Sequence, residues 1–228
     1  MNAKWLLIDA DDTLWENSIY FEQAFDEFVE LLGHSHLSAE QVRTVLDEIE
    51  LEAIRIHGYG TLNFARNLRN CYQTLAETPV SEKELDEAMR LAHTILERPI
   101  ELLDGVVDTL EYLNSRYHLT LFSKGHHAEQ HAKVDRSGVM RYFHACQIVR
   151  EKDAETYRRF IAQRNIDAAH AWMVGNSPKS DINPALEAGL GAVLVPHAMT
   201  WGLEHEDLPA ASDRFQIVER FSDLQRVF

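Results

Sequence analysis

Hydrophobic and polar positions follow two kinds of pattern along the 228 residues of the chain. A short apolar run, Trp5 to Ile8, is typical of a buried strand. Between it and Pro99, apolar residues recur every three or four positions, which predicts amphipathic helices. After Asp104-Gly105, short apolar runs alternate with helical patterns, as in a parallel sheet whose strands are joined by helices.

The helical segment has recognisable helix ends. Ser38 followed by Gln41, and Ser81 followed by Glu84, are capping-box sequences. Gly33 follows the first helical pattern and is typical of a residue that ends a helix. The pattern therefore predicts four helices, which span 19–32, 38–58, 62–75 and 81–96.

The remainder of the chain predicts a sheet that is completed by the first strand. Strands are expected at 119–122, 147–149, 171–174 and 192–195, with an edge strand at 215–218, and helices at 106–113, 154–163 and 181–188. The predicted fold class is α/β, a Rossmann-like parallel sheet core flanked by helices with an inserted all-helical, four-helix cap domain. The core is discontinuous, 1–16 and 98–228, and the cap is 17–97.

Composition narrows the choice of partners. With 22 basic and 37 acidic residues the formal charge is -15, which disfavours a nucleic-acid polymer or an anionic membrane as partner. Two cysteines are too few for a disulfide framework, and no run of apolar residues reaches membrane-spanning length. The N-terminus lacks the pattern of a secretion signal. We therefore expect a cytoplasmic protein without a membrane partner.

Polar residues follow the predicted strands at their carboxyl ends. Asp9, Asp11 and Asp12 follow the first strand, and Ser123-Lys124-Gly125 follows the next one along the chain. Ligands of open parallel sheets bind at this edge, so we expect these side chains to lie close together. An isolated Asp-x-Asp is equally well an acidic loop that caps a helix, and its chemistry depends on what the other strand ends supply. The later strand ends supply Lys152, Asn176 and Asp181.

This set of residues matches the needs of phosphoryl transfer, in which cations and hydrogen-bond donors must screen a negative nucleophile from a negative phosphate. Asp9 is the candidate nucleophile, which would form an aspartyl-phosphate. Asp11 is the candidate general acid and base. A Mg²⁺ ion is expected, with ligands from Asp9, a main-chain carbonyl near Asp11, and the loop from Asn176 to Asp181.

The same residues resemble the four motifs of the haloacid dehalogenase superfamily, chiefly its phosphatases. The motifs are Asp9-Ala10-Asp11-Asp12-Thr13, Ser123, Lys152 and the loop from Gly175 to Asp181, in the family's order across nearly the whole chain. The resemblance implies a Mg²⁺-dependent phosphatase acting on a small phosphorylated metabolite, with a cap between the first two motifs. It implies that Ser123 binds a phosphate oxygen and that Lys152 screens the nucleophile. Lys124 and Thr13 are further candidate phosphate contacts, although Thr13 could instead fix the loop.

Asn176 departs from the family pattern, because the phosphatases usually have an aspartate ligand there. An amide oxygen can bind Mg²⁺ but brings no charge, so weaker metal binding is expected. Three alternatives therefore stay open: a non-catalytic phosphate-binding protein with a decayed metal site, a metal-free dehalogenase, and a phosphomutase. Dehalogenases of the superfamily lack a carboxylate at the position of Asp11, which favours the phosphatase. Between the cap helices, Gly58-Tyr59-Gly60 is a candidate substrate-selecting loop.

Overall fold

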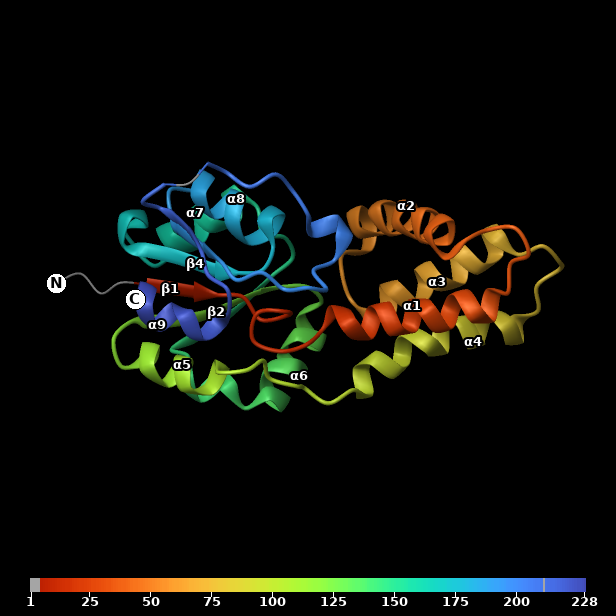
Figure 1. Ribbon diagram of the computed structural model, residues 1–228, viewed down its shortest axis with the longest axis horizontal. Coiled ribbons are helices and arrows are strands. Elements are labelled where there is room, and N and C mark those ends of the chain that lie inside the picture. The colour runs from red at the N-terminus through yellow and green to blue at the C-terminus, as the bar shows by residue number, and fades with distance from the viewer. Residues whose placement is uncertain (1–4, 211) are drawn as a thin grey trace. The chain divides into compact units, whose positions relative to one another are not determined.

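The computed structural model describes residues 5–210 and 212–228 and divides the chain into two compact units (Figure 1). One unit joins Met1–Ser18 to Ile100–Phe228, and the other is Ile19–Pro99. The sequence placed these boundaries after residues 16 and 97. The first four residues of the predicted core segment lie outside the described residues.

The first unit contains a parallel six-stranded sheet in the order β3-β2-β1-β4-β5-β6. Its strands are β1 Trp5–Ile8, β2 His118–Lys124, β3 Ala145–Val149, β4 Ala171–Gly175, β5 Gly191–Leu194 and β6 Phe215–Ile217. The chain passes from β1 to β2 and β3 on one side and then crosses to β4 on the other. The strand order therefore reverses between β1 and β4, which is where open α/β sheets bind their ligands.

Helices cover both faces of this sheet. Successive side chains of β1 are apolar and point to opposite faces, so both faces must be covered. Leu6 and Ile8 pack in one core cluster with residues of α5 (Val106–Asn114), α6 (His127–Ser137) and α9 (Leu224–Val227). Leu7 points to the other face and packs with residues of α7 (Ala154–Gln163) and α8 (Asn183–Glu187). Figure 1 shows α7 and α8 on one side of the strands and α5 and α9 on the other. The predicted α/β fold class is confirmed.

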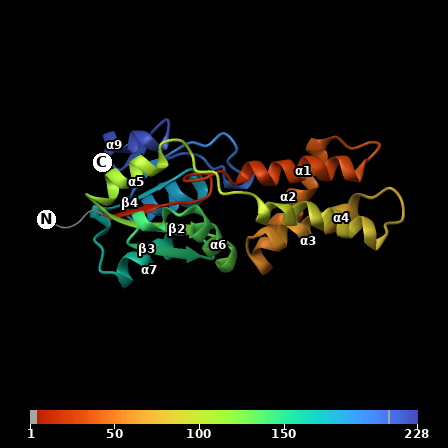
Figure 2. The ribbon, with the colours of Figure 1, turned by 90° about the horizontal axis from the view of Figure 1, so that it is seen from below.

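The second unit consists of four helices around a core of its own (Figure 2). The helices are α1 Ser18–Leu32, α2 Ala39–His57, α3 Thr61–Leu75 and α4 Glu82–His93, and a 3₁₀ turn covers Thr94–Glu97. Both predicted capping boxes are confirmed, because Ser38 and Ser81 each exchange hydrogen bonds with the residue three positions on. The fourth helix is shorter than predicted, since its last turn tightens into the 3₁₀ form.

One predicted element has a different conformation. The sequence predicts a helix over 181–188, but the structure has a π-helical turn, Pro178–Ile182, before the short α8. Ser177 Oγ accepts a hydrogen bond from the Ser180 N–H at the start of this turn, and Asp181 turns its carboxylate inward toward Lys152. Wide helical turns of this kind are rare and often occur at functional sites.

Candidate functional site

Asp9 lies at the carboxyl end of β1, where its backbone N–H donates to the carbonyl of Val174 at 2.9 Å. Its side chain is buried, with the residue only 7% exposed. Lys152 Nζ donates to Asp9 Oδ1, and Thr13 Oγ1 donates to Asp9 Oδ2 at 3.1 Å. Burial raises the pKa of Asp9 to about 7, although the charge of Lys152 opposes the shift.

Lys152 follows β3 and precedes α7, and it is as deeply buried as Asp9. Its ammonium group also donates to Asp181 Oδ1 at 2.6 Å, so two carboxylates share one cation. Burial acts to lower the pKa of Lys152, but the charges of Asp181 and Asp9 outweigh it and raise the pKa. The motif residues after β1, β3 and β4 therefore meet around one fixed positive charge.

Asp181 is held in place from two directions. The Ser177 N–H donates to Asp181 Oδ2 at 3.0 Å, while Oδ1 accepts from Lys152. The carboxylate lies directly against Gly175, where an added Cβ would come within 2.2 Å of Oδ2. Glycine is therefore required at the end of β4 for this placement of Asp181.

Asn176 and Asp9 present oxygens to the same hydroxyl group. Thr13 Oγ1 lies 3.1 Å from Asp9 Oδ2 and 3.3 Å from Asn176 Oδ1, and a hydroxyl has only one hydrogen to share between them. An oxygen pair that is under-supplied with donors fits a hard cation such as Mg²⁺. The side-chain oxygens of Asp11 and Asp181, by contrast, accept hydrogen bonds from nitrogen donors. Asp9 and Asn176 are therefore the residues of the predicted ligand set that fit a metal best.

The carboxylate of Asp11 accepts hydrogen bonds from two residues of α6. Lys133 Nζ lies 2.9 Å from both carboxylate oxygens of Asp11. Trp15 Nε1 donates to Oδ1 at 2.7 Å, and Gln130 Nε2 donates to Oδ2 at 2.9 Å. Burial acts to raise the pKa of Asp11, but Lys133 and these hydrogen bonds hold it below its usual value.

Ser123 and Lys124 end β2 at the same edge of the sheet. Ser123 Oγ is 2.6 Å from Gln130 Nε2, and Lys124 Nζ is 2.6 Å from Glu204 Oε1. Glu204 also accepts a hydrogen bond from Ser177 Oγ at 2.6 Å. The Lys124 ammonium is thus held by Glu204, a residue of the loop after β5.

Four residues of this edge were not predicted as part of the site: Gln130, Lys133, His197 and Glu204. The end of β5, the fifth strand, was the available signal, because the loop that follows it carries His197 and Glu204 to the same edge as the other motifs. Gln130 and Lys133 gave no such signal, since a polar pair three residues apart is ordinary for a solvated helix face.

A second cluster lies beside the acidic loop. Asp12, Glu16 and His197 bring one ligand atom each within 4.8 Å of one another, so the cluster could hold a metal ion. His197 Nε2 lies 3.2 Å from Glu16 Oε2. Asp12 Oδ1 accepts the backbone N–H groups of Asn17 and Ser18, so it also caps the start of α1.

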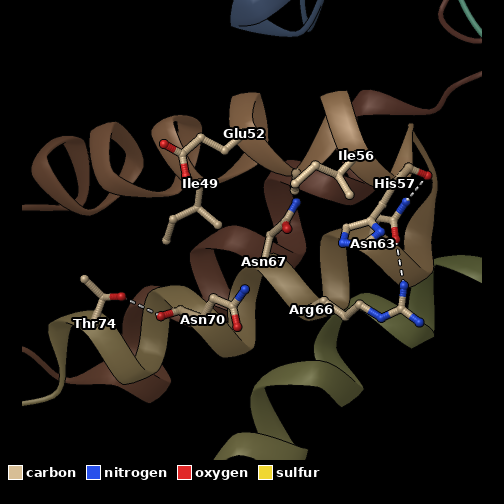
Figure 3. Close-up of a pocket in the computed structure, with 10 residues that line it drawn as sticks. Ile49, Glu52, Ile56, His57, Asn63, Arg66, Asn67, Asn70 and Thr74 are labelled. Atoms are coloured by element: carbon tan, nitrogen blue, oxygen red, sulfur yellow. Dashed lines mark hydrogen bonds between the residues drawn. The ribbon is translucent and has the colours of Figure 1, made fainter.

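The helical unit has a pocket of its own, of about 300 Å³, between α2 and α3 (Figure 3). Asn67 forms its buried floor, and Ile49 and Ile56 supply an apolar wall. Arg66 lies at its edge, where its guanidinium donates to Asn63 Oδ1 at 2.9 Å. The lining therefore combines apolar side chains with amide groups and one guanidinium group.

A search of the described ranges, 5–210 and 212–228, finds no helix that is long and apolar enough to cross a membrane.

A family model described as haloacid dehalogenase-like hydrolase matches residues 3–189. A search of curated proteins found no match.

Solved structures resemble the chain over nearly its whole length. A haloacid dehalogenase-like family hydrolase from Xanthomonas campestris has 26% identity and a TM-score of 0.86, over 99% of this chain and 90% of that one. A 2-haloacid dehalogenase from Pseudomonas syringae pv. tomato has 20% identity and a TM-score of 0.64, over 99% and 97%. A predicted phosphoglycolate phosphatase from Haemophilus somnus has 18% identity and a TM-score of 0.66, over 100% and 98%. The last two share the fold with this chain.

Proposed function

Because the chain belongs to the haloacid dehalogenase-like hydrolase family, we propose that it is a phosphatase that hydrolyses a small phosphate monoester. The most direct support is the buried Asp9 carboxylate, which lies at the end of β1 where the strand order of the sheet reverses. Lys152 donates a hydrogen bond to one of its oxygens, and a second acid, Asp11, follows two residues later in the sequence. A carboxylate at the position of Asp11 has a task in phosphate hydrolysis, where protons must be moved, and none in attack at carbon.

The reaction has two steps. Asp9 attacks phosphorus, the bond from phosphorus to the ester oxygen breaks, and Asp11 gives a proton to the departing alcohol. Asp11 then takes a proton from water as the water attacks the aspartyl-phosphate, which releases phosphate and frees Asp9. Throughout, the ammonium of Lys152 offsets the charge of the nucleophile, and Ser123 holds a phosphate oxygen.

We assign a Mg²⁺ site to Asp9, Asn176 and the main-chain carbonyl of Asp11. Mg²⁺ would supply positive charge to offset that of the phosphate. The support for this assignment is the convergence of Asp9 Oδ2 and Asn176 Oδ1 on the Thr13 hydroxyl. Since Asn176 carries no charge, we expect half-maximal activity at a higher Mg²⁺ concentration than for its Asn176→Asp variant.

The helical unit is proposed to be the cap that selects the substrate. It enters the sequence directly after the acidic loop, and its pocket between α2 and α3 offers an arginine and several amide groups. We expect the substrate to be a small phosphorylated metabolite, and neither a nucleic acid nor a membrane lipid, given the net charge of -15.

The test is a screen of phosphate monoesters with added Mg²⁺, read by released phosphate. The wild type should release phosphate from an aryl phosphate and from some metabolites, and Asp9→Asn or excess chelator should abolish the release. Full activity in Asp9→Asn would exclude Asp9 as the nucleophile. Binding of phosphate without turnover would indicate a non-catalytic binding protein, and transfer without release a phosphomutase.

A metal-free dehalogenase is the second candidate, favoured by the uncharged Asn176 and by the 2-haloacid dehalogenase among the similar structures. It predicts chloride release from a 2-chloro acid in the presence of chelator. Chloride release together with an absence of phosphatase activity would replace the phosphatase proposal with this one.

A further inference from the structure

Two residues of α6 contact the proposed general acid and base. Gln130 and Lys133 are three positions apart, so they lie on the same face of the helix. Lys133 Nζ lies 2.9 Å from each carboxylate oxygen of Asp11, and Gln130 Nε2 lies 2.9 Å from Oδ2. Helix α6 therefore carries both a charged and a neutral donor to one carboxylate.

Trp15 completes the donor set of Asp11. Its indole Nε1 donates to Oδ1 at 2.7 Å, and the residue is only 1% exposed, so packing fixes this donor. Lys133 is itself oriented by Asn17, whose Oδ1 accepts from Nζ at 2.7 Å. Each oxygen of the ionised Asp11 thus accepts from two donors, and one of these donors must leave the carboxyl group when it takes up a proton. One side-chain position satisfies all of these contacts.

Gln130 also connects Asp11 to Ser123 and Lys124 at the end of β2. Its Nε2 is 2.6 Å from Ser123 Oγ and 3.2 Å from the carbonyl oxygen of Lys124. The side chain is buried against Gly125, where an added Cβ would come within 3.1 Å of Gln130 Cγ. The proton-transfer group and the phosphate ligand are therefore held by one amide nitrogen.

We propose that Gln130 and Lys133 are positioning residues, which fix the Asp11 carboxylate for proton transfer, and that Gln130 also fixes Ser123. This inference rests on the proposed phosphatase function. Misplacement of a reacting group by about 1 Å lowers a rate by roughly 100-fold. Lys133 binds Asp11 and Asn17, whereas Gln130 also binds Ser123, so the two residues affect different kinetic parameters.

The first experiment measures kcat and KM of the full chain with Mg²⁺ for an aryl phosphate and an alkyl phosphate. Lys133→Met should lower kcat by about 10- to 100-fold with KM little changed. Its loss should be greater for the alkyl phosphate, because a poor leaving group depends more on a positioned acid. Gln130→Leu should lower kcat and also raise KM, since Ser123 loses its partner.

Two further variants separate positioning from folding. Lys133→Arg keeps a cation that can bind both oxygens of Asp11 and should restore most of kcat. Lys83→Met makes the same substitution at an exposed lysine of α4 and should leave both parameters unchanged. An equal loss on the two substrates in Lys133→Met, or no rescue by Lys133→Arg, would overturn the inference.

The second experiment does not depend on turnover. The assigned Trp15 indole N–H resonance reports the hydrogen bond to Asp11, and it should move in Lys133→Met and Gln130→Leu but stay in place in Lys83→Met. An unmoved resonance in both α6 variants overturns the positioning of Asp11. A moved resonance in a protein that releases no phosphate supports the positioning and rejects the phosphatase function, so the two failures are distinguishable.

Discussion

At the scale of residues, the site depends on the ammonium group of Lys152. This group lies between Asp9 and Asp181, and all three side chains are almost completely removed from solvent. Two buried carboxylates that contact the same group repel each other unless that group is a cation. The same cation that would screen the nucleophile therefore also stabilises the carboxyl edge of the sheet.

We predict that Lys152→Met lowers the free energy of unfolding by roughly 3–5 kcal/mol at neutral pH, because it leaves two buried carboxylates without their partner. Chemical denaturation of the full chain measures this loss. Lys179→Met, at an exposed lysine that donates to the carbonyl of Leu203, should change the value by less than about 0.5 kcal/mol. Equal stability of the two variants would show that the buried ion pairs are not important for folding.

The sequence identified several residues of this edge but not how they pair with one another. Asp9, Lys152 and Asp181 were recognisable because each follows a predicted strand in an α/β pattern. The sharing of Lys152 by two carboxylates depends on the wide π-helical turn at Pro178–Ile182, which has no signature in hydrophobic periodicity. The role of Glu204 could not be predicted either, because it lies in a single 3₁₀ turn, Gly202–Glu204, which is too short to give a periodic pattern.

At the scale of elements, α2 contains a buried acid, Glu50. Glu50 is 7% exposed, and burial raises its pKa to about 8, with Asp47 adding to the shift and Arg43 opposing it. The carboxyl group is therefore mainly protonated at pH 7 in the folded unit, whereas it is ionised at that pH when unfolded.

This difference predicts a pH dependence of stability. Between the unfolded pKa of about 4.3 and the folded pKa of about 8, the folded state holds more protons, so stability falls as pH rises through this window. The slope from Glu50 approaches about 1.4 kcal/mol per pH unit. Glu50→Gln should remove this contribution in denaturation measured from pH 5 to 8. The matched variant Glu48→Gln, at an exposed position of α2, should keep it; identical profiles for the two variants would contradict the assignment.

Helices whose ends carry a clear sequence motif were predictable, whereas the segment whose backbone is set by contacts at the site was not. The capping boxes at Ser38 and Ser81 set the starts of α2 and α4, so sequence placed both helices closely. The region 178–188 differed because side chains at the site, and not periodicity, set its backbone. A difference between the conformation that the local sequence predicts and the observed one is expected at a functional site, where the backbone must also place side chains for chemistry.

At the scale of the whole molecule, one unit holds the proposed chemistry and the other is proposed to choose the substrate. The net charge of -15 makes local positive groups the means of holding an anionic substrate. Arg66 is such a group, and it lies at the edge of the pocket of the helical unit (Figure 3).

We therefore predict that Arg66→Met raises KM on the order of 10-fold for the metabolites that the wild type hydrolyses, with kcat unchanged, as loss of one charged hydrogen bond implies. A small aryl phosphate should show a lesser change. Arg69→Met is the control, because Arg69 lies on the same helix but pairs with Glu82 outside the pocket. A change in kcat alone, or equal effects of the two variants, would exclude the pocket from substrate selection.

The central claim is that Asp9 carries the phosphoryl group during turnover. Rapid acid quenching of the wild type with a substrate and Mg²⁺, followed by borohydride reduction and peptide mass spectrometry, tests it most directly. An aspartyl-phosphate is reduced by this treatment to homoserine, so we predict homoserine at position 9 in the quenched reaction and aspartate there without substrate. Phosphate release with aspartate intact at position 9, or with homoserine at another position, would contradict the account.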